Sequence, residues 1–543
     1  MRSIILFALI LNSSLPSLLN AQLNQEWVRS YNGPVNGNDE ALTHTTDTYG
    51  NVYAAGKILG SATGFDIYVV KYNSSGSLLW EKIYNGPGSG NDIAYSITID
   101  RSGNVFVAGE SKGSDTNSDY VLIKYNTLGV EQWSRRYNGE SNSVEIPARV
   151  ITDSAGNSVI TGHSWETGTL FDFVTIKYNS EGNILWTRKF NGEANGNELA
   201  NDLDIDNSGN IYVTGSTIGA ATINDFVIIK YSAGGDELWT RTYNGPVNGN
   251  DNFTFITIDN NSNAVITGSS AGSGTGLDFA TIKYSPSGDV IWLKRFTSNS
   301  VNFEEPKAIA GDSSGNIYVT GTSTGSSSYD YMTVKYSAAG EEIWARRYNG
   351  PSGNNFDEPR SVTADNCGNV FVTGLSAGTG TMDDIVTIKY NSVGDELWVN
   401  RFNSAANRDD AANNISLDIY GNVIVSGFLT SLAGGTDFGV IKFSQLTGIV
   451  SADQIPGEYR LYQNYPNPFN PGTVIKFSIP FSGFISLKVF DISGKEVAVI
   501  FNGFRNPGTY EIDFDAYQLS SGTYFYRMIS ADQILTKKFI LIR

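Results

Sequence analysis

The sequence contains very few of the residues that build most catalytic and metal sites. Among its 543 residues there are one cysteine, two histidines and four methionines. The single cysteine, Cys367, excludes an intramolecular disulfide, so the fold must be stabilised by its core. With only His44 and His163, a histidine-ligated zinc site and Ser-His-Asp catalysis are poorly supported. HExxH, CxxC and Walker sequences are also absent.

Positive charge and long apolar runs are scarce as well. The chain has 37 Lys and Arg against 55 Asp and Glu, which gives a formal net charge of -18. This charge would repel the phosphates of a nucleic acid, so nucleic acid is not an expected partner. No segment is long and apolar enough for a transmembrane helix. The chain is instead rich in Gly (58), Tyr (29) and Phe (28). This composition is typical of an all-β protein with many tight turns.

The first 21 residues have the pattern of a secretory signal peptide. Arg2 precedes an apolar run from Ile4 to Leu11, and Ala21 is a small residue suited to a cleavage site. The run is too short to span a bilayer. We therefore predict a signal peptide over residues 1–21, with a cleavage point defined only to within a few residues.

Tryptophan marks an internal repeat. Eight of the nine tryptophans recur with spacings of 53 residues five times, then 52 and 54, and only Trp165 falls outside the series. The series is Trp27, Trp80, Trp133, Trp186, Trp239, Trp292, Trp344 and Trp398. Each period holds four short apolar segments bounded by Gly, Asn or Asp, which predict four antiparallel strands.

The two ends of the repeat region favour a closed ring. The array opens with a lone strand at residues 27–33 and finishes with three strands that end at Phe443. If the first strand completes the last sheet, eight four-stranded units form and no edge strand remains open. We predict an eight-bladed β-propeller over residues 22–449, with residues 27–33 paired to the strand near Lys442.

The repeats resemble the SBBP β-propeller repeat family. They share Asp-x-x-Gly-Asn followed by a hydrophobic-aromatic-hydrophobic run and Gly, as in residues 206–215. The resemblance covers residues 27–449, although the copy at 157–162 lacks the aromatic residue and the copy at 259–263 lacks the turn Gly. The family name implies seven blades, so a seven-bladed ring is the alternative to the eight units counted here.

The period stops after Gly448, and a second module follows. Six of the 15 prolines fall between Pro456 and Pro507. After a linker at 450–458, six strand-like segments within residues 459–543 predict a small Ig-like β-sandwich.

The second module carries specific motifs at residues 465–471 (YPNPFNP), 487–497 and 521–527. Together they closely resemble the type A C-terminal sorting domain of the bacterial type IX secretion system. The resemblance implies that residues 459–543 engage the type IX machinery. It also implies that the protein is extracellular, or on the outer-membrane surface, of a Gram-negative-type bacterium.

Carboxylates recur at two places in the repeats. One set ends the first strand: Asp100, Asp153, Asp206, Asp312, Asp365 and Asp418. The other starts the third strand: Asp66, Asp119, Asp172, Asp225, Asp278, Asp330, Asp384 and Asp437. Residues that recur in every unit are explained most simply by turns and packing. A lysine closing the third strand, as in Lys71, lies at the same end as the first set and predicts a structural ion pair.

Calcium is the one cofactor that this pattern leaves open. The face with the loops that join the fourth strand to the first, and the second to the third, is rich in Asp and Asn oxygens. The Asp-x-Asp-x-Asp-Gly spacing of a calcium loop is nevertheless absent. We expect no other cofactor, no metal ligands and no catalytic residues.

Two functions of different classes compete. The leading hypothesis is a secreted, non-enzymatic module that binds or scaffolds a surface glycan or protein. The alternative is a carboxylate-dependent glycan-active hydrolase or lyase, since two acids suffice for that chemistry. An enzyme should break the repeat symmetry with a unique acid pair.

The predicted ligand site lies on the face with the longer loops and consists of Trp165, His163 and Asp172. Trp165 is placed in the loop between the second and third strands, where no other copy has a tryptophan. Loops of this kind carry function, and a large amphipathic ring can anchor a ligand.

Overall fold

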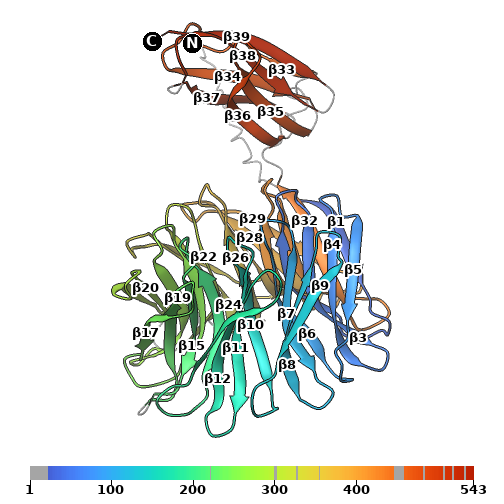
Figure 1. The fold of residues 1–543 in the computed structure, drawn as a ribbon, viewed down its shortest axis with the longest axis vertical. Helices are drawn as coiled ribbons and strands as arrows, with labels where there is room; N and C mark the ends of the chain where they lie inside the picture. The colour runs from blue at the N-terminus through green and yellow to red at the C-terminus, as the bar shows by residue number, and fades with distance from the viewer. Residues whose placement is uncertain are drawn as a thin grey trace, which may run out of the picture. The chain divides into compact units, whose positions relative to one another are not determined.

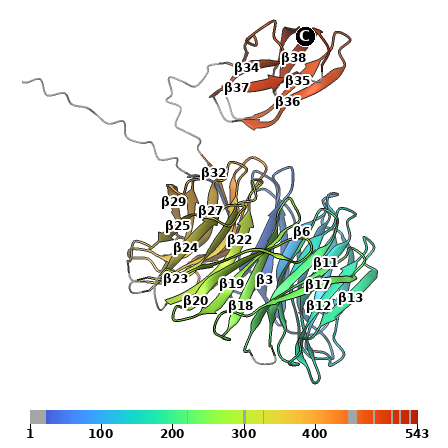
Figure 2. The same cartoon turned by 90° about the vertical axis from the view of Figure 1, so that its left-hand side faces the viewer.

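The computed structural model describes residues 23–445 and 458–542, apart from gaps at 220–221, 299–301, 326–327, 354, 481–482, 506–507, 517–518 and 531–532. The predicted signal peptide at 1–21 and all but the last residue of the predicted linker at 450–458 lie outside the described residues. Two compact units are present, one of residues 22–445 and one that contains residues 446–543 (Figures 1 and 2). Within the described residues the named elements are all strands, and no helix could cross a membrane.

Strands β1–β32 of the first unit form eight antiparallel sets of four in the described part of the chain, and two of these sets are joined by a short parallel pairing of β20 with β22. We number these sheets 1 to 8 in chain order and give each from its first to its fourth strand. Sheet 1 is β2 (Glu40–Thr46), β3 (Val52–Gly60), β4 (Gly64–Tyr72) and β5 (Leu78–Tyr84). Sheet 2 is β6 (Asp92–Ile99), β7 (Val105–Lys112), β8 (Ser118–Tyr125) and β9 (Glu131–Tyr137). Sheet 3 is β10 (Glu145–Thr152), β11 (Ser158–Glu166), β12 (Leu170–Tyr178) and β13 (Ile184–Phe190). Sheet 4 is β14 (Leu199–Ile205), β15 (Ile211–Thr217), β16 (Asp225–Tyr231) and β17 (Glu237–Tyr243).

The remaining sheets repeat this order. Sheet 5 is β18 (Asp251–Ile258), β19 (Ala264–Gly272), β20 (Gly276–Tyr284) and β21 (Val290–Phe296). Sheet 6 is β22 (Asn302–Gly311), β23 (Ile317–Thr324), β24 (Tyr329–Tyr336) and β25 (Glu342–Tyr348). Sheet 7 is β26 (Asp357–Ala364), β27 (Val370–Ala377), β28 (Asp383–Tyr390) and β29 (Glu396–Phe402). Sheet 8 is β30 (Ala411–Leu417), β31 (Val423–Thr430), β32 (Thr436–Gln445) and β1 (Leu23–Tyr31).

The first unit is a closed ring. β1 pairs antiparallel with β32 and places Trp27 opposite Lys442, which is the pairing predicted from the sequence. The first strand of each sheet contacts the first strand of the next, from β2 to β30, and β30 contacts β2. These first strands are therefore the inner strands around the axis of a β-propeller, and the fourth strands form its outer rim.

Apolar seams hold neighbouring sheets together. The middle strands are buried on both faces, as in β15 and β16. Seven of the described seams are closed at the rim by a tryptophan of one sheet and the turn between the third and fourth strands of the next. Trp133 Nε1 donates to the Ser180 carbonyl at 3.0 Å, and a Cβ on Gly182 would come within 2.7 Å of the Trp133 ring. Only glycine fits below the ring, and its φ of +80° suits the turn.

The lysine that closes each third strand pairs with an aspartate or lies over an aromatic ring, and Lys230 does both. In four sheets it forms the predicted ion pair with the aspartate that follows the first strand: Lys177–Asp153 (2.9 Å), Lys230–Asp206 (3.8 Å), Lys283–Asp259 (2.8 Å) and Lys442–Asp418 (2.8 Å). In the other four its ammonium lies over an aromatic ring instead: Lys71 over Tyr53, Lys124 over Phe106, Lys335 over Tyr318 and Lys389 over Phe371. The residue opposite the lysine on the second strand decides between the two. It is aliphatic in the three sheets with short ion pairs: Val159, Val265 and Ile424. The ring therefore competes with the carboxylate for the ammonium.

The second unit is a β-sandwich. One sheet has the order β33 (Arg460–Leu461), β34 (Gly472–Ile479) and β37 (Gly508–Asp515). The other has the order β36 (Glu496–Arg505), β35 (Gly483–Phe490), β38 (Gly522–Ile529) and β39 (Ile534–Leu541). Ile475, Leu487 and Phe539 belong to a core made only of residues of this unit.

Candidate ligand-binding site

The placement of Trp165 in a loop is wrong. Trp165 lies within β11, where it pairs with Phe171 of β12, because the ladder continues as far as Glu166 and Leu170. Only residues 167–169 connect the two strands, so this connection is also shorter than the sequence suggested. Gly168 in the connection has a positive φ, which permits the tight turn.

The structure brings His163 and Trp165 together but separates them from Asp172. The Phe171 ring packs edge-on against both, with centroid distances of 5.0 Å to His163 and 5.1 Å to Trp165. Asp172 follows Phe171 and points to the opposite face of the sheet. Burial lowers the pKa of His163 to about 4, so its ring is neutral at pH 7.

Asp172 belongs to a repeated acidic seam. The seam consists of the carboxylate before or at the start of each inner strand and the third-strand aspartate of the preceding sheet. Glu198 N donates to the Phe171 carbonyl at 2.7 Å, which sets Glu198 beside Asp172. In the next seam, Asp251 N donates in the same way to the Asn224 carbonyl. Burial raises the pKa of the carboxylates near the inner strands: Asp39, Asp92, Glu145, Glu198, Asp251, Glu304, Asp357 and Asp410.

These seam carboxylates have structural partners. Asp92 accepts backbone N–H bonds from Gly86 and Lys112, and so ties an inner strand to its incoming loop and to β7. In four seams an arginine of the outer strand pairs with the third-strand aspartate: Arg136–Asp119, Arg295–Asp278, Arg347–Asp330 and Arg401–Asp384. Within the described residues, no group of three or more His, Cys, Asp or Glu is arranged to hold a metal ion. Calcium binding remains a prediction.

One acid pair does break the repeat symmetry, and sequence analysis missed it. Asp202 and Asp204 lie two residues apart on inner strand β14. Asp202 Oδ2 accepts from Ile256 N (3.2 Å) and Asp204 Oδ2 from Ile258 N (2.9 Å), so both cover the free edge of β18. Burial is the main cause that raises the pKa of Asp204 to about 6. The detectable signal was two acids at inner-strand positions that carry no acid in the other seven copies.

The start of the inner strands is also asymmetric around the axis. We call its partly or fully exposed side chains the axial rim: Glu40, Leu42, Ile93, Tyr95, Ile146, Ala148, Leu199, Asn201, Asn252, Phe253, Glu305, Lys307, Glu358, Arg360 and Asn413. In sheets 2 to 4 most of these residues are apolar. In sheets 6, 7, 8 and 1 all but Leu42 are polar or charged.

The polar half of the axial rim forms one continuous chain of contacts. Lys307 bridges Glu305 (3.0 Å) and Glu358 of the next sheet (3.3 Å). Arg360 pairs with Glu358 (3.5 Å) and donates to Asn413 Oδ1 in sheet 8 at 2.7 Å. The chain continues from Asn413 to Glu40 (2.9 Å) and ends at the ion pair of Glu40 with Lys57 (3.0 Å). Three acids are balanced by three bases, so this half has no formal net charge.

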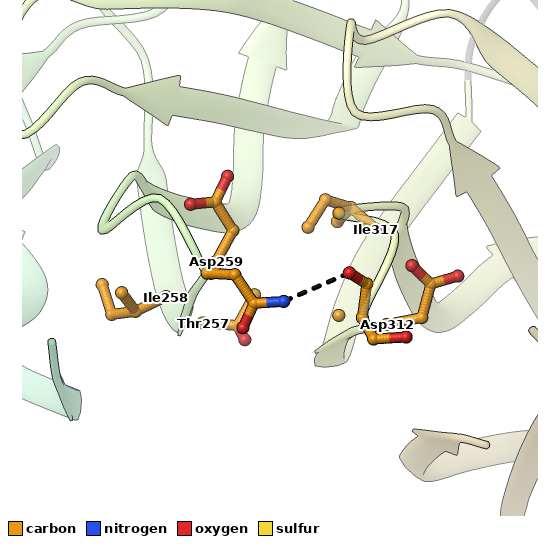
Figure 3. A pocket seen from close by; sticks show the side chains of 9 residues that line it. Thr257, Ile258, Asp259, Asp312 and Ile317 are labelled. Carbon is orange, nitrogen blue, oxygen red and sulfur yellow. Dashed lines mark hydrogen bonds between the residues drawn. The ribbon is translucent and has the colours of Figure 1, made fainter. Parts of the chain in front are cut away.

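A separate pocket of about 280 Å³ lies at the opposite ends of the inner strands, between sheets 5 and 6 (Figure 3). It is lined by residues 257–260 and by residues around the β22–β23 turn. Asn260 Nδ2 donates across it to the Ser313 carbonyl at 3.1 Å. The space exists because Gly311 ends β22 without a side chain, whereas the other seven sheets have Thr, Ile, Leu or Ala there. We interpret the pocket as a packing gap.

The sequence matches two known families. Residues 463–542 match the secretion system C-terminal sorting domain, and residues 84–115, 185–220 and 291–327 match the β-propeller repeat. The chain therefore carries β-propeller repeats and a C-terminal sorting domain. That domain makes it a secreted or cell-surface protein that interacts with the type IX secretion machinery.

Individual similar proteins add little about function. An uncharacterized WD repeat-containing protein of Acanthamoeba polyphaga mimivirus is 25% identical over 423 residues, which are 68% of this chain and 27% of that protein. The chain therefore spans about a quarter of that relative's length. Among solved structures, an ulvan lyase has a TM-score of 0.41 at 9% identity, covering 63% of this chain and 90% of its own. The α-L-arabinofuranosidase of Fusarium graminearum has a TM-score of 0.35 at 9% identity, covering 66% and 93%.

Proposed function

We propose that the propeller is a non-enzymatic module that binds or scaffolds a ligand on the surface of a Gram-negative-type bacterium or outside it. The observation that carries the proposal is the axial rim. Most other positions of the repeats carry similar residue types that make the same structural contacts. At the axial rim they differ from sheet to sheet, with one polar half and one mostly apolar half. Specific recognition combines apolar contact area with a few placed polar groups.

The test is a binding screen of the purified full chain against surface glycans and surface proteins, followed by one rim variant. Arg360→Ala removes the link from sheet 7 to sheet 8 and should weaken binding by roughly 1–3 kcal/mol, the range of a modest hot spot. The control is Lys476→Ala, which breaks a comparable ion pair with Glu511 in the sorting domain. Equal affinity of both variants and the unmodified chain would remove the polar half of the axial rim from the site.

The alternative function, a glycan-active hydrolase or lyase, is favoured by the pair Asp202 and Asp204. Their position on an inner strand and the pKa of about 6 for Asp204 suit a general acid near neutral pH. Against this hypothesis, one oxygen of each carboxylate accepts a backbone N–H from β18. New reducing ends or unsaturated products from a glycan panel, lost in Asp204→Asn, would establish the enzyme.

A further inference from the structure

Phe253 is the most irregular residue of the axial rim. Its φ is +57° and its side chain is 53% exposed. The other seven inner strands bury a small residue here: Ala41, Ala94, Pro147, Ala200, Pro306, Pro359 and Ala412. In β18 the ladder to β19 jumps from Asn252 to Phe255, so two residues bulge where the other sheets have one.

The bulge lowers the stability of the fold for two reasons. A bulky residue in the left-handed region is strained, and an exposed ring gives up the free energy of burial. Strained residues of this kind cluster at binding and catalytic sites. Thr254 takes over the buried position, and its hydroxyl accepts from Thr214 of sheet 4 at 2.9 Å. The fold therefore holds Phe253 outward.

Asn201 lies beside this bulge on the neighbouring inner strand. The next residue, Asp202, accepts a hydrogen bond from Ile256 N of β18. Thr214 lies opposite Asp202 in the ladder, and its hydroxyl donates to Thr254. The Asn201 Oδ1 atom is buried, and no hydrogen bond reaches it from the described part of the chain. A buried amide oxygen without a donor is costly. The Asn201 side chain as a whole is only partly buried, so a rotation of its amide would present this oxygen to a ligand hydroxyl.

We infer that Phe253 and Asn201 bind a neutral saccharide at the axial rim. The Phe253 ring packs against the apolar face of a sugar ring, and Asn201 Oδ1 accepts a hydroxyl hydrogen bond. In the polar half of the axial rim, three acids pair with three bases. This half therefore offers no free charge to an ionic ligand. This inference rests on the proposed binding function and names its ligand class.

Glycine at position 253 separates a binding role from a structural one. Phe253→Gly relieves the positive φ and removes the ring, so the variant should melt at the same or a higher temperature. Its affinity for neutral oligosaccharides should fall by roughly ten- to a hundredfold. Phe253→Trp keeps an aromatic face and should retain binding. The matched control is Ser262→Gly, which relieves a φ of +62° in the β18–β19 turn and should leave affinity unchanged.

The assay is calorimetric titration of the full chain with neutral gluco-, manno-, xylo- and arabino-oligosaccharides, with uronic-acid oligomers as a charged arm. Weakened binding of Phe253→Gly with retained binding of Phe253→Trp supports the inference. Undiminished saccharide binding by Phe253→Gly overturns it. Binding only to uronic acids or to a protein overturns the ligand class and leaves the proposed function standing. Absence of saccharide binding by the unmodified chain overturns the inference, and absence of any ligand in the screen of surface glycans and surface proteins overturns the proposed function as well.

Discussion

At the residue scale, buried carboxylates dominate the physical chemistry of this propeller. The seam carboxylates have raised pKa values because burial disfavours their charged form. Backbone N–H bonds oppose this effect without cancelling it. Because a buried carboxylate of this kind recurs in all eight sheets, the free energy of unfolding should depend on pH. Glu145 is the clearest single contributor.

Glu145 is fully buried and burial is the main cause that raises its pKa to about 7. A carboxyl group whose folded pKa is raised stabilises the fold below its ordinary pKa of 4.5, and this contribution is lost as the pH rises to 7. Glu145→Gln should therefore gain about 1–2 kcal/mol relative to the unmodified chain at pH 7, with little difference near pH 4. Urea unfolding from pH 4 to 8 measures the difference, and a constant difference across this range would contradict the assignment.

Gly311 offers a second prediction, on packing. A Cβ built there has its closest contact at 3.7 Å, which is ordinary van der Waals distance, and it would enter the pocket of Figure 3. Gly311→Ala should raise the free energy of unfolding by roughly 0.5–1 kcal/mol. The control, Gly321→Ala, places its Cβ 2.2 Å from the Glu305 carbonyl oxygen and should destabilise. Denaturant melts check both variants, and a destabilised Gly311→Ala would show that the gap is required.

Sequence reasoning reached the repeated residues far better than the exceptional ones. The contacts of Trp133 and Lys177 could be predicted because the equivalent residues recur in the eight copies at nearly constant spacing. Phe253 gave a usable signal, a large residue where seven copies have Ala or Pro, but the two-residue bulge that exposes it depends on register. Trp165 was misplaced because strand ends extend by pairing, which composition does not encode.

At the scale of elements, β1 is the part on which ring closure depends. It supplies the fourth strand of sheet 8, and the buried Leu23 and Trp27 pack there. Trp27 Nε1 also reaches the Ser74 carbonyl of sheet 1 at 3.2 Å, so the same strand ties sheet 8 to sheet 1. The edge of β32 would otherwise be open.

Deleting residues 23–31 should lower the free energy of unfolding by at least about 3 kcal/mol, the cost of exposing two large side chains and an edge. Hydrogen exchange should then increase first in β32. A synthetic peptide of residues 22–33 should restore protection, whereas the same peptide with Trp27→Ala should restore less. Unchanged exchange in β32 after the deletion would show that β1 is dispensable.

At the scale of the whole molecule, the two units have separate cores. The sandwich core, with Phe477 and Phe539, includes no residue of the propeller. The propeller seams, such as the one around Trp133 and Val174, include none of the sandwich. Folding of the propeller and its export are therefore separable properties, even though one chain carries both.

Removal of residues 459–543 tests this separation. The truncated propeller should keep its melting temperature, because no seam between its sheets is touched, but it should stay inside the outer membrane, because the sorting domain is the part that engages the secretion machinery. Cell fractionation locates the protein, and thermal melts of the purified truncated propeller report its fold. The control is Gly494→Ala, which strains an exposed turn of the sandwich at φ +84° without removing the domain, and it should still be exported. Normal surface delivery of the truncated chain would refute the sorting role, and an unfolded truncated propeller would refute the independence of the two cores.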